Sequence, residues 1–226
     1  MTTSRRAVPA RVRARDREQR DPATRERLLA AATQRFADHG FNNVKVRDVC
    51  RDARANVAAV NYHFGDKLGL YREVVRAAID AIREAGDASM AVGRDMPAAD
   101  RLRHYVRTYV PRLASRDSRV AWIHNLMRHE MSEPTPLAPW IAEQAIFPRI
   151  QFLSELVAEL LGCKLGDRRV AWCVASIQAQ CLIYAPHRFH DIAFKGMPTS
   201  ASDLEAVADH IAEFSLAGIR KATKRG

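Results

Sequence analysis

Apolar residues recur along this chain at intervals of three and four, the period of an amphipathic helix, and alternating strand patterns are nearly absent. The first such segment begins at Asp21, a favourable N-cap residue, with Pro22 at the first helical position. Its apolar face consists of Leu28, Leu29, Ala32 and Phe36. We expect this helix to end at His39-Gly40, because glycine readily adopts the left-handed conformation that ends helices.

Two short helical segments and a longer one come next. The first short segment spans residues 46–53, and the second begins after Asn56 as N-cap and places Val57, Val60 and Phe64 on one side. The longer segment opens with Asp66 as its cap and fades at Gly86. Three helices this short and this closely spaced are typical of a helix-turn-helix unit.

The rest of the chain predicts a second, larger helical unit. Its candidate helices span residues 97–114, 118–132, 137–161, 167–185 and 202–222. Proline in a helix interior removes a backbone donor, so Pro148 predicts a kink in the third of these. The predicted fold class is all-α: an N-terminal tri-helical helix-turn-helix domain and a larger C-terminal helical domain.

Composition and charge narrow the choice of partner. The chain has 226 residues, of which 47% are hydrophobic, and this excludes disordered and collagen-like classes. Its 36 Lys and Arg exceed its 26 Asp and Glu, and residues 1–80 hold 17 of the basic against 10 of the acidic residues. Residues 1–20 predict a flexible basic arm, for which a passive tail is the alternative. Clustered positive charge favours a nucleic-acid partner.

Cysteine usage and hydropathy bear on location. Cys50, Cys163, Cys173 and Cys181 form no C-x-x-C pair, so we expect neither a disulfide nor a zinc framework. An N-terminal apolar stretch typical of a secretory signal is absent, and the longest mainly apolar segment, residues 171–186, is too short to span a bilayer. We expect a soluble cytoplasmic protein with no cofactor, no bound metal and no membrane partner.

The third helix carries the candidate DNA contacts. With Val60 and Phe64 turned inward, its outward positions are expected to be Ala58, Ala59, Asn61, Tyr62 and His63. Small alanines permit close approach to a thymine methyl group, an asparagine can pair bidentately with adenine, and Tyr62 and His63 can bond to phosphates or base edges. Lys67, in the first turn of the next helix, adds a cation beside backbone amides that favour phosphate.

These residues resemble a known family. Residues 40–50, GFNNVKVRDVC, and 56–67, NVAAVNYHFGDK, resemble the DNA-binding domain of TetR-type transcriptional regulators, over roughly residues 22–75. Residues 127–136, MRHEMSEPTP, and 157–162, VAELLG, are similar to the C-terminal domain of the CecR-like subgroup. The resemblance implies a homodimeric repressor that reads a palindromic DNA operator and is released by a small-molecule effector. Together with the arm (1–20), we therefore expect a DNA-binding domain (21–66) and a ligand-binding and dimerisation domain (67–226).

Carried over by position, the resemblance assigns DNA-binding residues and exposes two departures. The base-facing sites fall on Val57, Ala58, Asn61, Tyr62 and His63, and the phosphate-binding sites on Ala59, Tyr62 and Lys67. Lys45 stands where the family usually has a capping Ser or Thr, so the cap bond is lost, although the lysine can reach a phosphate. Arg54 stands where glycine is usual in the turn. A non-glycine residue at positive φ costs roughly 1–2 kcal/mol, so either the turn differs or the strain is tolerated.

The resemblance also implies a ligand pocket and a dimer interface in the larger domain. The candidate pocket residues combine apolar bulk with a few polar groups: His104, Tyr105, Tyr109, Trp122, Leu126, Met127, Trp140, Phe147 and Phe152. Each of these can equally be an ordinary core residue. The segment 167–185 is apolar nearly all round and therefore needs covering on every side, and 202–222 combines apolar with small residues. We expect both helices to form an isologous four-helix homodimer interface, and a helix buried wholly within the monomer is the alternative.

Other classes of protein remain as alternatives. His129-Glu130 resembles part of a zinc-protease helix, but Glu133 stands where the second histidine is required, so that motif fails. His187 and His190 could chelate a metal, and the cysteines could sense redox state, but surface histidines and inert thiols are the simpler interpretations. A helical enzyme is therefore disfavoured. A DNA-binding protein that responds to no ligand is the remaining alternative.

Overall fold

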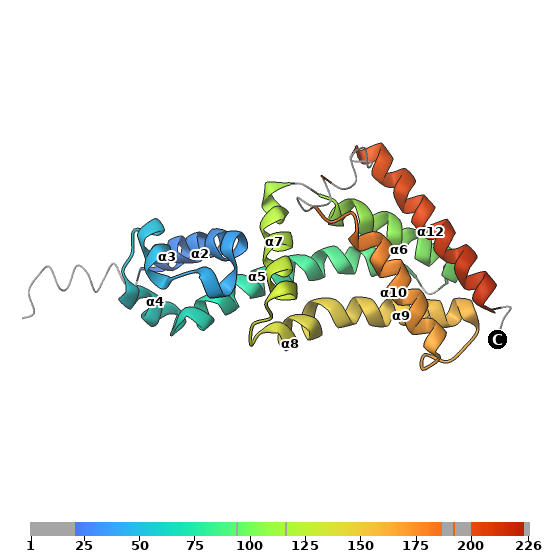
Figure 1. Ribbon diagram of the computed structural model, residues 1–226, viewed down its shortest axis with the longest axis horizontal. Helices are drawn as coiled ribbons and strands as arrows, with labels where there is room; N and C mark the ends of the chain where they lie inside the picture. The colour runs from blue at the N-terminus through green and yellow to red at the C-terminus, as the bar shows by residue number, and fades with distance from the viewer. Residues whose placement is uncertain (1–20, 94, 116, 187–191, 193–199, 224–226) are drawn as a thin grey trace, which may run out of the picture. The chain divides into compact units, whose positions relative to one another are not determined.

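The computed structural model describes residues 21–93, 95–115, 117–186, 192 and 200–223, and within these it contains helices and no strand. The elements are α2 (Pro22–Asn43), α3 (Val46–Asp52), α4 (Val57–Phe64), α5 (Lys67–Met90), α6 (Ala98–Leu113), α7 (Ser118–Ser132), α8 (Ala138–Ile141), the π-helical segment η1 (Ala142–Ile146), α9 (Phe147–Leu161), α10 (Arg168–Leu182) and α12 (Ala201–Thr223) (Figure 1). The predicted all-α class is confirmed. The basic arm and the pair His187 and His190 lie outside the described residues.

The helix ends of the N-terminal region follow the sequence signals closely. Asp21 caps α2 by accepting a hydrogen bond from the Ala23 N–H, and Pro22 occupies the first turn. Gly40 has φ 74° and ψ 166°, so the regular helix breaks at the predicted glycine, and a further turn continues to Asn43. The prediction for α5 was wrong at its end. Because a helix interior tolerates one glycine at about 1 kcal/mol, α5 runs through Gly86 to Met90.

Contacts divide the chain into two compact units, and the division differs from the expected boundary after residue 66. Unit 1 comprises residues up to 78 together with 125–137, and unit 2 comprises 79–124 together with 138–226. Two of the three boundaries fall inside α5 and α7, and the third lies just before α8. Unit 1 includes the first half of α5 because Leu70, Tyr71, Val74 and Val75 are buried in its core.

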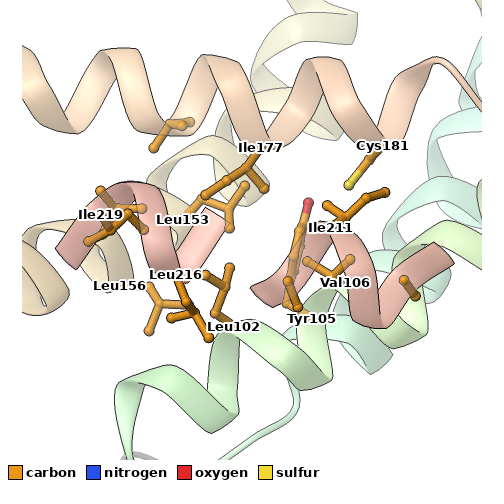
Figure 2. Packing of buried hydrophobic residues seen from close by; sticks show 14 of the residues in the cluster. Leu102, Tyr105, Val106, Leu153, Leu156, Ile177, Cys181, Ile211, Leu216 and Ile219 are labelled. Atoms are coloured by element: carbon orange, nitrogen blue, oxygen red, sulfur yellow. The ribbon is translucent and has the colours of Figure 1, made fainter. Parts of the chain in front are cut away.

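The core of unit 2 is built by α6, α9, α10 and α12 (Figures 1 and 2). Figure 2 shows Leu102 and Tyr105 of α6, Leu153 and Leu156 of α9, Ile177 and Cys181 of α10, and Ile211, Leu216 and Ile219 of α12 gathered in one cluster. Burying large aliphatic side chains in this way contributes about 1.5–3 kcal/mol each. The packing makes unit 2 a framework that holds residues from distant parts of the sequence together.

The helix predicted over 137–161 is interrupted just before Pro148. The Phe147 N–H bonds to the Ala142 carbonyl five residues back, which makes η1 one π-helical turn between α8 and α9. Pro148 then lies in the first turn of α9, where its missing N–H costs no helical hydrogen bond. The sequence therefore predicted the place of the disturbance and not its π-helical form. Within the described residues, none of the helices is long and apolar enough to cross a membrane.

Candidate nucleic-acid interface

One face of α4 is turned to solvent and the other is buried in unit 1. The side chain of Tyr62 is 59% exposed, and Val57, Ala58 and Asn61 are also exposed. Val60 is fully buried, as the sequence predicts. Residues 57, 58, 61 and 62 share one side of a helix because the spacing of four residues is close to one turn. A helix of this size fits the major groove of B-DNA, so this face can present side chains to base edges.

Two of the expected outward positions on α4 do not face solvent as predicted. The prediction for Ala59 was wrong: its side chain is 1% exposed, and its N–H donates to the Asn56 side chain at 3.0 Å. The buried residues of α4 are thus Ala59 and Val60, and Phe64, also expected to face inward, is only partly buried. His63 is only partly exposed, its Nε2 is buried without a hydrogen-bond partner, and its ring packs edge-on against Tyr62 at 5.0 Å. His63 therefore orients Tyr62 more directly than it offers a base contact.

The two candidate phosphate-binding lysines have different surroundings. Lys45 is exposed at the start of α3 and makes no side-chain cap bond, as the sequence predicts. The Lys67 ammonium lies 4.3 Å from the centre of the Phe41 ring, and partial burial lowers the pKa of this group. The Phe41 ring also contacts Tyr71, with 4.9 Å between ring centroids. Lys67 is thus held in a defined position on the unit 1 core, whereas Lys45 projects from a helix end.

The turn between α3 and α4 accepts the predicted strain at Arg54. Arg54 has φ 50° and is the only described non-glycine residue at positive φ. Its N–H donates to the Arg51 carbonyl at 3.2 Å, and the Ala55 N–H donates to the Cys50 carbonyl at 2.9 Å. These are the two hydrogen bonds of a Schellman helix end, in which glycine is the usual central residue. Arg27 supports the turn from α2 by donating to the Ala53 carbonyl at 3.2 Å, a contact that the sequence does not reveal.

Comparisons with known proteins agree with this geometry. Residues 28–74 match the model for bacterial regulatory proteins of the tetR family. Residues 98–219, more than half of the chain, match the model for the C-terminal domain of the HTH-type transcriptional dual regulator CecR. The chain belongs to the TetR family. Its members are DNA-binding transcription regulators, and this one has a C-terminal domain of the CecR type.

Relatives of this TetR-family regulator support the same assignment. It is 28% identical over 155 residues to the transcriptional dual regulator CecR of Shigella flexneri, a match that covers 65% of this chain and 68% of that protein. It is 27% identical over 122 residues to the transcriptional regulator BetI of Agrobacterium fabrum, over 54% of this chain and 50% of that protein. A solved transcriptional regulator from Rhodococcus shares the fold at a TM-score of 0.59 and 21% identity, covering 86% of this chain and 96% of that one.

The segment 125–137 of this TetR-family regulator packs against the DNA-binding helices through a buried carboxylate. Glu130 accepts hydrogen bonds from the Tyr71 hydroxyl at 2.5 Å and from the Thr135 hydroxyl at 2.8 Å and N–H at 3.2 Å. Burial and the adjacent carboxylate raise the pKa of Tyr71, so its hydroxyl stays a donor. Arg128, two residues before Glu130, is exposed and donates to the Asn125 side-chain oxygen at 3.2 Å. The buried carboxylate is a structural tie within unit 1.

Gly40 meets the same segment closely. A Cβ added to Gly40 would lie 3.0 Å from Nδ1 of His129, so the position requires glycine for its backbone angle and for its space. Asn42 adds a hydrogen bond to Glu133 at 3.1 Å. The sequence signal for these contacts was present in the MRHEMSEPTP motif, but nothing in the periodicity indicated that it packs against α2 and α5.

The nine candidate pocket residues fall into groups. Tyr105, Tyr109 and Phe152 come together in unit 2, with Tyr105 and Tyr109 stacked at 5.4 Å and Tyr105 and Phe152 5.9 Å apart. Phe147 is 57% exposed in the single chain, which argues against an interior pocket position. Two of the others, Leu126 and Met127, belong to unit 1. The remaining three, His104, Trp122 and Trp140, are partly exposed residues of unit 2. His104 contacts the Ala88 carbonyl at 3.4 Å.

Proposed function

We propose that this regulator is a homodimeric repressor that binds a palindromic operator through α4 and leaves it when a small-molecule effector binds the C-terminal domain. The observation that carries the proposal is the exposed α4 face formed by Val57, Ala58, Asn61 and Tyr62 on a well-packed core. An asparagine side chain can recognise adenine by two hydrogen bonds, and a tyrosine hydroxyl can bond to a phosphate. Lys45 and Lys67 would supply phosphate contacts on either side.

The exposed surfaces of α10 and α12 support the homodimer. On α10, Trp172, Ala175, Ala179 and Leu182 are exposed and recur at helical spacing along one side. On α12, Phe214 and the small residues Ala217 and Gly218 are exposed near the C-terminal end. Contiguous apolar surface of this kind marks an interaction site, and small residues permit close helix crossing. A second copy of the same helices would cover these faces by a two-fold axis, which explains why a palindromic operator is expected.

A repressor that responds to a ligand also needs a way for ligand binding to change DNA binding. We propose that a ligand bound in unit 2 changes the state of the dimer that engages both half-sites, through α5, which belongs to both units. Half-sites about one DNA turn apart are bound jointly only when the two reading helices have the matching separation. Chromosomal DNA as partner implies a cytoplasmic site of action.

Selection of genomic fragments by the purified protein, followed by titration of variants, tests the assignment. Asn61→Ala and Tyr62→Ala are each expected to weaken binding to the selected site by about 1–3 kcal/mol, with dimerisation unchanged. Gln151→Ala is the control, because it removes an exposed amide from α9 in unit 2. Unchanged affinity in both α4 variants would show that another surface reads the DNA. Selected sites without two-fold symmetry would contradict the palindrome.

A further inference from the structure

Unit 2 holds a polar cluster within its aromatic core, which we call the Arg149 cluster: Arg149 and Phe152 of α9, Tyr105 and Tyr109 of α6, and Gln178 and Cys181 of α10. The Arg149 guanidinium lies over the Tyr109 ring, 4.8 Å from its centre. The Tyr109 ring stacks on Tyr105, whose hydroxyl accepts a hydrogen bond from the Gln178 amide at 3.1 Å. Figure 2 shows the Tyr105 hydroxyl directed toward the end of α10 that carries Cys181. Residues from three helices therefore converge on one cation.

Two polar atoms in the Arg149 cluster have no hydrogen-bond partner. Arg149 Nε is buried and has no hydrogen-bond partner. Gln178 is only 7% exposed, and its Oε1 atom is also buried without a partner. Among the described residues, no carboxylate forms an ion pair with Arg149. A buried donor that lacks a hydrogen bond is costly, and the same holds for a buried acceptor. One donor and one acceptor thus stay unused in the same cluster.

Another arginine of unit 2, Arg101, makes the contacts expected of a structural guanidinium. Arg101 is buried, pairs with Glu159 and donates from Nε to the Met96 carbonyl at 3.0 Å. Where Arg101 has a carboxylate and a carbonyl oxygen, Arg149 has the ring of Tyr109. The Arg149 Nε therefore stays available to a group supplied from outside the chain.

The charges in the Arg149 cluster favour a ligand with a single negative charge. Burial raises the pKa values of Tyr105 and Tyr109 and raises that of Cys181 to about 12, while the positive charge of Arg149 acts on all three in the opposite direction. These groups therefore stay neutral, and Arg149 is the one cation that acts on them among the described residues. A single positive charge balances a carboxylate and leaves a doubly charged phosphate uncompensated.

We propose that the Arg149 cluster binds a small organic acid, with its carboxylate on Arg149, its apolar body against Tyr109 and Phe152, and a donor group on Gln178. The proposal rests on the proposed effector response and names the chemical class of the effector. Arg149, Tyr109, Phe152 and the nearby Tyr184 are partly exposed, so the edge of the cluster is open to solvent. Charge-assisted hydrogen bonds to a planar guanidinium favour a carboxylate over its neutral amide.

Calorimetric titration of the full chain tests this class directly. The probes are benzoate, phenylacetate, 4-hydroxybenzoate and hexanoate, each compared with its own amide. At least one acid is expected to bind tenfold or more tightly than its amide, and Arg149→Met is expected to abolish that preference by weakening acid binding about tenfold or more. Arg107→Met is the matched control, because it removes an exposed arginine of α6 that pairs with Asp209. No acid bound in preference to its amide, or equal binding by Arg149→Met, would overturn the proposal.

Two further measurements separate a ligand site from a structural role. Replacing Arg149, whose buried Nε lacks a partner, by methionine is expected to raise Tm by about 2–4 °C, whereas replacing a structural arginine would lower it. Arg149→Lys keeps the charge and loses the planar fork, so acid binding is expected to weaken even if Arg149→Met fails to fold. If wild-type protein binds the operator and is released by neutral compounds only, the organic-acid proposal fails and the repressor function stands.

Discussion

The two short helices of the DNA-binding unit differ at both of their ends. Helix α4 begins at Asn56, whose side chain accepts from the Ala59 N–H at 3.0 Å, and ends at Gly65 with φ 81°. Helix α3 begins at Lys45, which makes no cap bond, and is followed by Arg54 with φ 50°. Helix α4 thus has the favoured residue types at both ends, and α3 departs from them twice.

Both departures in α3 place a cation where a capping residue or a glycine is favoured. A missing N-cap costs typically about 1 kcal/mol, and a non-glycine residue at positive φ costs roughly 1–2 kcal/mol. Lys45 and Arg54 are both exposed, so neither is held there by packing. We infer that α3 gives up stability at its ends for positive charge near DNA, while α4 keeps stable ends because its own side chains must be held rigidly for reading.

The largest expected effect concerns which face of α4 is buried and which is exposed to solvent. Ala59→Leu forces a larger side chain into a buried position and is expected to destabilise the protein by about 1–3 kcal/mol in urea unfolding. Ala58→Leu adds the same atoms at an exposed position and is expected to change stability by less than about 0.5 kcal/mol, while weakening operator binding. Equal unfolding midpoints for the two variants would contradict the inward placement of Ala59.

The second prediction concerns the residues that follow the two helices, Gly65 after α4 and Arg54 after α3. Gly65→Ala is expected to cost roughly 1–2 kcal/mol from the backbone alone, because an added Cβ at Gly65 meets nothing within 4 Å. Arg54→Gly is expected to stabilise the protein by roughly the same amount, since it relieves the strain at φ 50°. Thermal unfolding of both variants measures the two effects.

A glycine with ordinary backbone angles provides the control for these substitutions. Gly166 also has open space around its Cβ position, but its φ lies outside the left-handed region. Gly166→Ala is therefore expected to be neutral or slightly stabilising. A loss of stability in Gly166→Ala as large as that in Gly65→Ala would remove the conformational explanation.

The third prediction concerns the helix beginnings. Asn56→Ala removes an observed cap bond and is expected to cost about 1 kcal/mol, whereas Lys45→Ala removes no cap bond and is expected to leave stability within about 0.5 kcal/mol of wild type. Chemical denaturation of the two variants side by side measures the difference. If Lys45→Ala were the more destabilising change, the capping comparison between α3 and α4 would be wrong.

The DNA-binding unit was predictable from sequence because its features are local. Asp21, Asn56 and Asp66 each accept a hydrogen bond from an N–H two or three residues later, so caps and helix starts can be read from short stretches. Ala59 was misplaced because two adjacent alanines carry no polarity difference to show which one faces inward. In an eight-residue helix, apolar periodicity alone does not determine the width of the buried stripe.

The C-terminal unit was predictable in its helices and much less in its site. Tyr105, Arg149 and Gln178 lie on three helices far apart in sequence, and only tertiary packing brings them together. Nothing in the local pattern distinguishes Arg149, which has no ion-pair partner among the described residues, from Arg101, which is paired with Glu159. The burial of Glu130 against Tyr71 was hidden for the same reason, because its partner is 59 residues away.

The smallest expected effect joins stability and DNA binding in one residue. Lys45→Ser restores a capping side chain to α3 and is expected to add about 0.5–1 kcal/mol to the free energy of unfolding. The same change removes a cation, so operator affinity should fall and the slope of log affinity against log salt should decrease by about 1. Lys164→Ser is the control, because it removes an exposed lysine from unit 2, whereas α3 and α4 belong to unit 1. A more stable protein with an unchanged salt slope would mean that the missing cap on α3 serves some purpose other than contact with phosphate.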